Sequence, residues 1–324
     1  MEENTEQRVD LTLFSEKIQE SKDWIASVIV GQEQTVDLVL TAILANGHVL
    51  IEGVPGVAKT LLARLTARLI DADFSRVQFT PDLMPSDVLG TTVFNMKTNG
   101  FDFHQGPIFA DIVLVDEINR APAKTQAALF EVMEERQISI DGTTHRMGDL
   151  YTILATQNPV EQEGTYKLPE AQLDRFLMKI TMDYPSLEEE VNILERHHTN
   201  AALVKLDDIV PAITKEELLS LRAFMNQVFV DRTLLQYIAL IVQQTRTSKA
   251  VYLGASPRAS VAMLQSSKAY ALLQGRDFVT PEDIKFVAPY VLQHRLILTA
   301  EAEMEGYSPV KVTQRLIDKV EVPK

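Results

Sequence analysis

The chain has 324 residues, 46% of them hydrophobic, and a formal net charge of −14. This length allows two domains with sizeable cores, and the hydrophobic content excludes a disordered protein. The negative charge argues against non-specific binding to duplex DNA, which requires clustered Lys and Arg. Cysteine is absent, which excludes disulfides and thiolate metal sites and fits a reducing compartment.

The start of the chain, Met1-Glu2-Glu3-Asn4, is acidic and lacks the apolar core of a signal peptide. The most apolar stretches, such as residues 237–242, are far too short to span a bilayer. We therefore expect a cytoplasmic protein without a membrane segment.

Helix-like and strand-like segments alternate along the first part of the chain. The spacing of apolar residues predicts helices over residues 11–29, 33–44, 59–70 and 123–136. Short apolar runs predict strands over residues 48–52, 112–115, 150–155 and 176–180. This alternation favours an α/β fold with a parallel sheet covered by helices on both faces. Ligands of such sheets bind beyond the carboxyl ends of the strands.

The pattern changes after Pro185. Capping boxes begin at Ser186, Thr214 and Thr280, and each predicts the start of a helix. We therefore divide the chain into an α/β core over residues 1–185 and a smaller helical domain over residues 186–324. Pro185 is the expected hinge, and the tail from Ser308 is expected to pack back on the body.

The most informative stretch is Gly53-Val54-Pro55-Gly56-Val57-Ala58-Lys59-Thr60, which follows the first predicted strand. It is typical of a loop whose backbone N–H groups point at phosphate oxygens at the start of a helix. Lys59 can reach the outer phosphates, and the Thr60 hydroxyl can bind magnesium. The alternative is an ordinary turn between a strand and a helix.

Ala58 stands where the last glycine of such loops is usual. Alanine tolerates ordinary backbone angles but not a strained left-handed one. The loop can therefore still form if Ala58 is not left-handed.

Polar residues also follow the later predicted strands. Asp116 and Glu117 end the strand over residues 112–115; the first could hold magnesium, and the second could accept a proton from the water that attacks the γ-phosphate. Asn158 could hydrogen-bond that water and the phosphate. The alternatives are an acidic turn and a loop that starts at Asn-Pro.

Two arginines are further candidates. Arg175, just before the last predicted strand, could reach the γ-phosphate of a neighbouring subunit, or could form a surface pair with Asp174. Arg258 follows Ser256-Pro257 at a predicted helix start and could contact the γ-phosphate.

The region from Arg232 to Arg276 holds six Lys or Arg and no Asp or Glu. It is either an ordinary solvated surface or a face turned toward nucleotide phosphates or an acidic neighbour. Glu131, Glu134 and Glu135 are possible complements. Charge reversal at Lys249 and Lys268 that leaves assembly and turnover unchanged would exclude the second interpretation.

Taken together, these elements resemble the MoxR family of AAA+ ATPases over nearly the whole chain. The resemblance rests on the following sequence motifs: the loop at 53–60, Asp-Glu-Ile-Asn-Arg-Ala-Pro at 116–122, Ala-Thr-Gln-Asn-Pro at 155–159, Leu-Pro-Glu-Ala-Gln-Leu-Asp-Arg-Phe at 168–176 and Ser-Pro-Arg-Ala at 256–259. The resemblance implies a five-stranded parallel sheet and an all-helical C-terminal lid domain. The Ala58 spelling resembles the family's own variant of the loop.

The resemblance also implies roles for individual residues. Asp116 and Glu117 correspond to the Walker B motif, Asn158 to sensor one, Arg175 to the arginine finger and Arg258 to sensor two. ATP and Mg²⁺ are the implied cofactors, with Thr60 and Asp116 as metal ligands. The implied nucleotide-binding residues are Gly53, Val54, Pro55, Gly56, Val57, Ala58, Lys59, Thr60, Leu61 and Arg258. Whether Arg258 acts in its own subunit or in the next one is left open.

Two hairpins are expected in addition. The resemblance suggests an insert before the Walker B strand, and the segments around Asn99-Gly100 fit a hairpin. Residues 138–144 read as a second hairpin. In related ring ATPases such hairpins face the central pore; the alternative is plain solvent loops.

The function implied by the resemblance is ATP hydrolysis by a ring, hexameric by expectation, that remodels client proteins, often ones with von Willebrand factor A domains. The rival hypotheses are a nucleic-acid motor, a metal-chelatase motor subunit and a non-enzymatic nucleotide switch. Because the chain is acidic and neither hairpin is basic, no stable nucleic-acid binding is expected.

Overall fold

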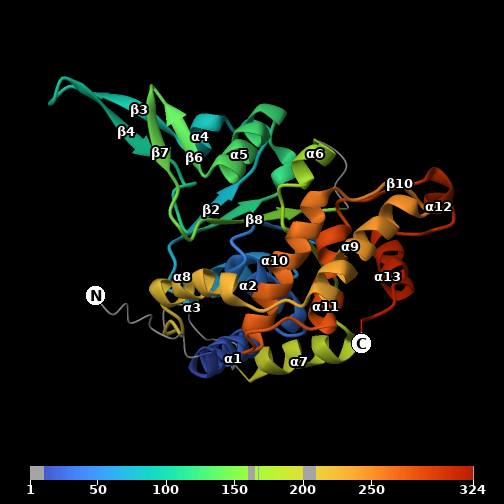
Figure 1. Cartoon of the computed structure of the whole chain (residues 1–324). Helices are drawn as coiled ribbons and strands as arrows, with labels where there is room; N and C mark the ends of the chain where they lie inside the picture. Colours follow the sequence, from blue (N-terminus) through green and yellow to red (C-terminus); the bar gives the residue numbers. More distant parts are fainter. Residues whose placement is uncertain (1–10, 160–164, 167, 200–208, 324) are drawn as a thin grey trace, which may run out of the picture.

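The computed structural model describes residues 11–159, 165, 166, 168–199 and 209–323 (Figure 1). The acidic start of the chain lies outside the described residues. The described part begins with α1 (Leu11–Val28) and α2 (Glu33–Leu44). Both helices were predicted within a residue or so of these bounds.

The centre of the fold is a five-stranded parallel sheet in the order β2-β5-β8-β1-β9. Its strands are β1 (Val49–Gly53), β2 (Phe74–Gln78), β5 (Ile112–Asp116), β8 (Thr152–Gln157) and β9 (Met178–Met182). The sequence predicted all of them except β2. That edge strand reads Phe-Ser-Arg-Val-Gln, and only Val77 in it is buried, so it lacks the apolar run by which the others were found.

Alternate residues of the central strands belong to two apolar clusters, one on each face of the sheet. Ile51, Ile112 and Leu154 pack with α2 and with α3 (Lys59–Leu69). Their neighbours Leu50 and Val113 pack on the other face, with α5 (Ala123–Glu135). This alternation is what a sheet with both faces covered requires.

Two hairpins project from one end of the molecule, at the top left of Figure 1. The first follows α4 (Pro85–Leu89) and consists of β3 (Gly90–Asn95) and β4 (Gly100–Gln105); the second consists of β6 (Gln137–Ile140) and β7 (Thr143–Arg146). Asp141 and Gly142 both have positive φ, which suits a two-residue hairpin turn. Both expected hairpins are therefore confirmed as structures.

The region after β9 is helical, as expected, and it lies at the right of Figure 1 and across its front. Its helices are α7 (Leu187–His198), α8 (Lys215–Phe224), α9 (Arg232–Thr247), α10 (Pro257–Leu273), α11 (Pro281–Leu292), α12 (Ala300–Met304) and α13 (Pro309–Lys319). It also carries a short antiparallel pair, β10 (Val251–Leu253) with β11 (Ile297–Leu298).

This helical region packs on the sheet region through a shared apolar cluster. Met263 and Ala269 of α10 belong to the same cluster as Val39 of α2 and Ile51 of β1. The tail forms α13, which packs on α11 and α9, so the expectation that it returns to the body is confirmed. The domain boundary near residue 185 stays a prediction.

The segment between β1 and α3 turns through two left-handed residues. Gly56, with φ +88°, is the first of them. Gly53 is required for space, because a Cβ there would lie only 2.8 Å from the carbonyl oxygen of Met182. Ala58 has φ 62° and ψ 23°, so it is left-handed, and the condition inferred from the sequence for this loop is not met. Ala58 packs against the apolar cluster beside buried Val57, and this packing holds a conformation that costs an L-residue about 1–2 kcal/mol.

Replacement of Ala58 by glycine should therefore stabilise the protein. We expect Ala58→Gly to raise the free energy of unfolding by about 0.5–1 kcal/mol, because the released strain exceeds the entropy that glycine adds to the unfolded chain. Chemical denaturation of the variant and the wild type measures this difference in the free energy of unfolding. Ala58→Val is the matched control and should destabilise, since a β-branched residue resists this region. A less stable Ala58→Gly variant would contradict the assignment of strain.

Two histidines are buried in the core. The Ile153 N–H donates to Nδ1 of His48 at 2.9 Å, and Nε2 of His48 donates to the Met133 carbonyl at 3.1 Å, which ties β1, β8 and α5 together. Burial, and secondarily the nearby Arg136, lowers the pKa of His48 from 6.5 to about 3. Burial also lowers the pKa of His294 well below its ordinary value.

These shifts make stability fall in mild acid. Below about pH 6.5 the unfolded chain binds protons that the folded protein excludes, so each histidine removes about 1.4 kcal/mol per pH unit. We expect the free energy of unfolding to drop by about 2–3 kcal/mol between about pH 7.5 and pH 5.5 in denaturant titrations. His197→Gln, at an exposed position, should show the same drop. Equal stability at both pH values would contradict this account.

Candidate functional site

The carboxyl ends of β1, β5 and β8 meet at one edge of the sheet, because all strands run in the same direction. The loop that ends at Thr60 follows β1, Asp116 ends β5, and Asn158 directly follows β8. The Lys59 ammonium donates to the carbonyl oxygens of Val54, at 2.9 Å, and Gly53, so it lies at the mouth of the loop. The fold therefore brings together the candidates that the sequence proposed for phosphate and metal.

Asp116 is buried and held from three sides. The Thr156 hydroxyl donates to its Oδ1 at 2.8 Å, and the Thr60 hydroxyl lies 3.4 Å from its Oδ2. Arg76 binds the same Oδ2 through Nε and Nη2, at 2.8 and 2.7 Å. The carboxylate is thus fixed in direction before any ligand arrives.

The hydroxyl and carboxylate oxygens of Thr60 and Asp116 form a donor set that suits magnesium. Magnesium prefers oxygen ligands and keeps several waters, so two protein groups are enough beside phosphate oxygens. The 3.4 Å separation shows that the two groups converge on one place. Bound there, the metal would neutralise phosphate charge.

Glu117 has a left-handed backbone, with φ 56°, directly after the last residue of β5. Its N–H donates to the Thr156 hydroxyl at 3.0 Å. Its carboxylate accepts from Nε2 of Gln78 at 2.7 Å and pairs with Nε of Arg120 at 3.2 Å. Glutamate rarely adopts the left-handed backbone conformation. Its presence in that conformation at a candidate catalytic position indicates that the surrounding structure determines its placement.

Sequence reasoning missed Arg76 and Gln78. They are two residues apart on β2 and therefore on one face of the strand, and each holds one of the two neighbouring carboxylates. Because β2 itself escaped prediction, no pattern pointed to them. Only the pairing of β2 with β5, which places Gln78 beside Asp116, brings them to the site.

Asn158 is buried and follows the last residue of β8. Its place, one strand away from both β5 and β1, is where an amide could contact a water and a phosphate at the same edge. Leu61 lies in the first turn of α3, half-buried, directly after Thr60.

The two candidate arginines lie elsewhere. Arg175 follows α6 (Glu170–Leu173) and precedes β9, so it lies at the amino end of the strands. Arg258 is in the first turn of α10 and lines, with Arg175 and Gly47, a cavity of about 550 Å³. Gly47 precedes β1, whereas the phosphate-binding candidates follow it.

The five residues of β1 separate these two groups by about 15 Å. Arg258 therefore accompanies Arg175 and not the loop of its own chain. The expected site residues form two groups at opposite edges of one sheet: the loop with Asp116, Glu117 and Asn158, and the arginine pair.

Both arginines contact the same carboxylate on α5. Nη2 of Arg175 lies 2.6 Å from Oε2 of Glu134, and Nη2 of Arg258 lies 3.6 Å from Oε1. Asp174, the alternative partner of Arg175, instead accepts from Nε of the buried Arg295 at 2.6 Å. Asp174 and Arg175 therefore do not form the surface pair considered from the sequence: Arg175 pairs with Glu134, and Asp174 pairs with Arg295.

The cations between Arg232 and Arg276 do not form one free surface. Arg276 binds Asp283 through both Nη atoms, at 2.8 and 2.6 Å. Arg246 and Lys268 donate to the carbonyls of Ala255 and Met225. These contacts remove Arg246, Lys268 and Arg276 from a common charged face. Arg258, by contrast, faces Glu134, one of the acidic complements considered from the sequence.

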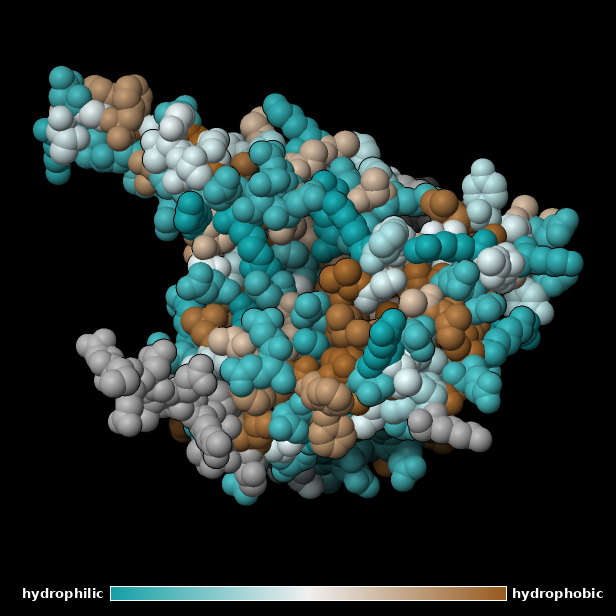
Figure 2. Space-filling view, viewed as in Figure 1, coloured by the Kyte–Doolittle hydropathy of each residue, from teal (hydrophilic) through white to brown (hydrophobic). Residues whose placement is uncertain are grey.

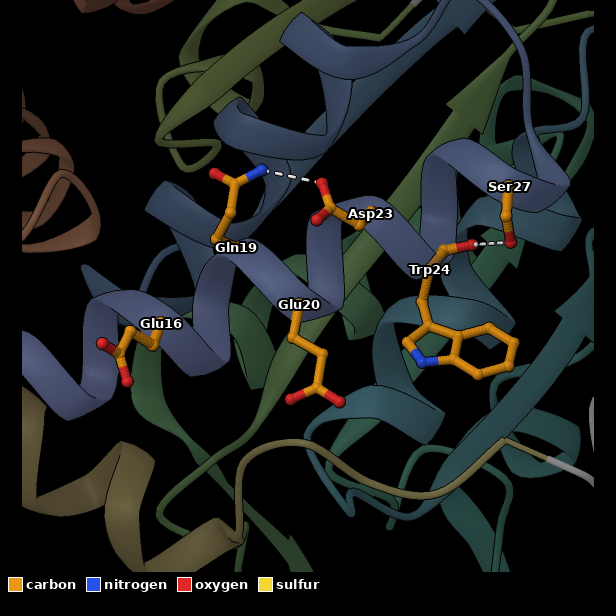
Figure 3. Close-up of a pocket in the computed structure, with 6 residues that line it drawn as sticks. All are labelled: Glu16, Gln19, Glu20, Asp23, Trp24 and Ser27. Carbon is orange, nitrogen blue, oxygen red and sulfur yellow. Dashed lines mark hydrogen bonds between the residues drawn. The ribbon is translucent and has the colours of Figure 1, made fainter.

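Another hollow, of about 570 Å³, lies along α1 (Figure 3). Glu16, Glu20, Asp23 and Trp24 line it, and Gln19 donates to Asp23 at 2.8 Å. Three carboxylates would repel a triphosphate, so this hollow does not mark the phosphate site. In addition, none of the described helices is long and apolar enough to cross a membrane.

Comparison with known proteins agrees with this geometry. Residues 48–178 match the model of the ATPase family associated with various cellular activities (AAA), and residues 243–318 match the AAA lid domain. The chain is 48% identical over 299 residues to the uncharacterized protein YeaC of Bacillus subtilis, covering 92% of each. It is 44% identical over 309 residues to chaperone MoxR1 of Mycobacterium tuberculosis, covering 93% of this chain and 81% of that protein.

A solved structure gives the same result. The crystal structure of a proposed ATPase from Cytophaga hutchinsonii superposes with a TM-score of 0.88 at 41% identity, covering 97% of both chains. Protein MoxR of Methylorubrum extorquens is 31% identical over 303 residues, covering 86% of this chain and 87% of that protein. The chain belongs to the MoxR family of AAA+ ATPases, with an AAA domain followed by a helical AAA lid.

Proposed function

We propose that the protein hydrolyses ATP at sites shared between copies of the chain. The observation that carries the proposal is the separation of the candidate residues between two opposite edges of one parallel sheet. A head-to-tail stack of subunits brings the arginine edge of one copy to the phosphate edge of the next. Such a heterologous contact closes into a ring when its rotation closes, and a hexamer is the expectation from the family.

Within the site, each group has a distinct role. Backbone N–H groups of the loop and the Lys59 ammonium bind the phosphates. Thr60 and Asp116 hold magnesium. Glu117 accepts a proton from the attacking water, and Asn158 orients that water against the γ-phosphate.

The neighbouring copy completes the site. Arg175 and Arg258 of that copy would neutralise charge that develops on the γ-phosphate, an effect worth several powers of ten in rate where arginine fingers have been measured. Because Arg258 belongs to the lid and Arg175 to the sheet region, hydrolysis would alter the contact of both with the neighbour.

A protein client fits the projecting hairpins better than a nucleic acid does. The β3–β4 hairpin exposes Phe94, Met96 and Phe101. Figure 2 shows a brown patch among hydrophilic atoms on the projection at the top left. Exposed apolar groups of this kind mark protein interaction sites, whereas nucleic-acid motors need basic ones. Since one relative is named a chaperone, we propose a chaperone-like remodelling activity in the cytoplasm, with von Willebrand factor A domain proteins as the expected clients.

Labelled DNA separates this proposal from the nucleic-acid motor. Fluorescence anisotropy with single- and double-stranded oligonucleotides should show no saturable binding at physiological salt. Tight, saturable binding that stimulates hydrolysis would favour the motor instead.

Two substitutions test the catalytic assignments. Lys59→Ala should lose ATP affinity, because it removes the cation that the loop presents to the phosphates. Glu117→Gln should retain affinity and lose turnover by about two orders of magnitude or more, because the amide cannot accept the proton. Binding of a fluorescent ATP analogue and phosphate release measure the two effects. A Glu117→Gln variant with the parent rate would refute the role of this residue.

The stalled Glu117→Gln variant also offers a way to the client. Affinity capture in the presence of ATP should retain a client that wild-type protein releases. Recovery of a tetrapyrrole-binding partner would favour the chelatase alternative, and recovery of a von Willebrand factor A domain protein would support the proposal.

A further inference from the structure

Glu134 makes a contact that the proposed function does not require. It lies near the carboxyl end of α5, and each of its two carboxylate oxygens faces a different arginine: Oε2 faces Arg175 and Oε1 faces Arg258. The three side chains come from α5, from the turn after α6 and from α10. One carboxylate therefore joins the sheet region and the lid.

We propose that Glu134 is an internal substitute for the γ-phosphate of the neighbouring subunit. It holds Arg175 and Arg258 together while the subunit is alone, and it must be displaced when a triphosphate-loaded neighbour docks. This inference rests on the proposed function, because it assumes that the arginine pair serves the site of another copy.

Positive charge exceeds negative charge around Glu134, so this place could accept a further anion. Two guanidinium groups face one carboxylate, and Arg136 lines the same cavity of about 550 Å³. Nε of Arg175 is buried and makes no hydrogen bond to any described residue. A terminal phosphate, with more oxygens and more charge than a carboxylate, could use the donors that Glu134 leaves unsatisfied.

The exposure of the pair shows that it can be exchanged. The side chains of Glu134 and Arg258 are 39% and 69% exposed, and ion pairs that water reaches contribute little to stability. By contrast, Arg295, which binds Asp174 in the same cavity, is only 5% exposed and donates to several carbonyls. Arg295 anchors the fold, whereas Arg258 and also Arg175, whose side chain is 27% exposed, can change partner.

The test is assembly of Glu134→Gln measured by analytical ultracentrifugation. The neutral amide keeps the size of the side chain but releases the arginines from the competing charge. With magnesium and a slowly hydrolysed ATP analogue, we expect half-maximal assembly at a protein concentration about three- to tenfold lower than for wild type. With ADP, which lacks the γ-phosphate, the two proteins should assemble alike.

Glu135→Gln is the matched control, because it makes the same charge change one residue away, where no contact to either arginine is seen. It should behave as wild type with both nucleotides. A shift of Glu134→Gln that is equal with ADP and with the analogue would mean a general charge effect, and unchanged or weaker assembly would mean that Glu134 does not compete; either result overturns the inference.

The outcome for wild type separates this inference from the proposed function. If wild type assembles with the analogue and hydrolyses ATP while Glu134→Gln shows no gain, only the inference fails. If wild type neither assembles nor hydrolyses ATP, the proposed function fails, and the inference fails with it.

Discussion

The common direction of the five strands is the constraint on which the rest of the structure depends. Because β1, β5 and β8 all end at one edge, the residues that directly follow these strands lie close together, and no long loop is needed to bring them there. The same constraint places Arg175, which precedes β9, at the opposite edge. Under the proposed function, a single copy therefore carries both halves of a phosphoryl-transfer site and cannot join them.

The edge strand β2 gives the candidate catalytic edge its rigidity. Arg76 and Gln78 fix the directions of Asp116 and Glu117, and Thr156 links the two carboxylate-bearing residues through its hydroxyl. Preorganised groups of this kind lower the reorganisation needed during reaction. Ala58 and Glu117 both have left-handed backbones near this edge. These strained conformations lower the stability of the fold while they place the loop and the candidate base.

Most of the fold could be predicted from local patterns. The apolar runs of β1 and β5 have both faces buried, and the capping boxes at Ser186 and Thr214 form as their sequences require. The loop and the carboxylates after β5 were recognised because each is local to one strand end.

What the sequence did not reveal depends on contacts between distant segments. Strand β2 has little apolar character and is defined by its pairing with β5, so Arg76 and Gln78 were missed with it. The conformation of Ala58 is imposed by packing, which a glycine-based rule cannot anticipate. The position of Arg258 beside Glu134 follows from how α10 lies on α2, and no spacing in the sequence encodes that distance.

Mixing of two inactive variants tests the shared site most directly. Glu117→Gln retains Arg175, and Arg175→Ala retains Glu117, so a mixed assembly contains interfaces at which both residues are intact. If each site is built by two copies, a one-to-one mixture should recover about a quarter of the wild-type ATPase sites, since one in four random interfaces has the productive order. If the mixture hydrolyses ATP no faster than the sum of its separate components, although the two variants co-assemble, the account of a site divided between subunits is wrong.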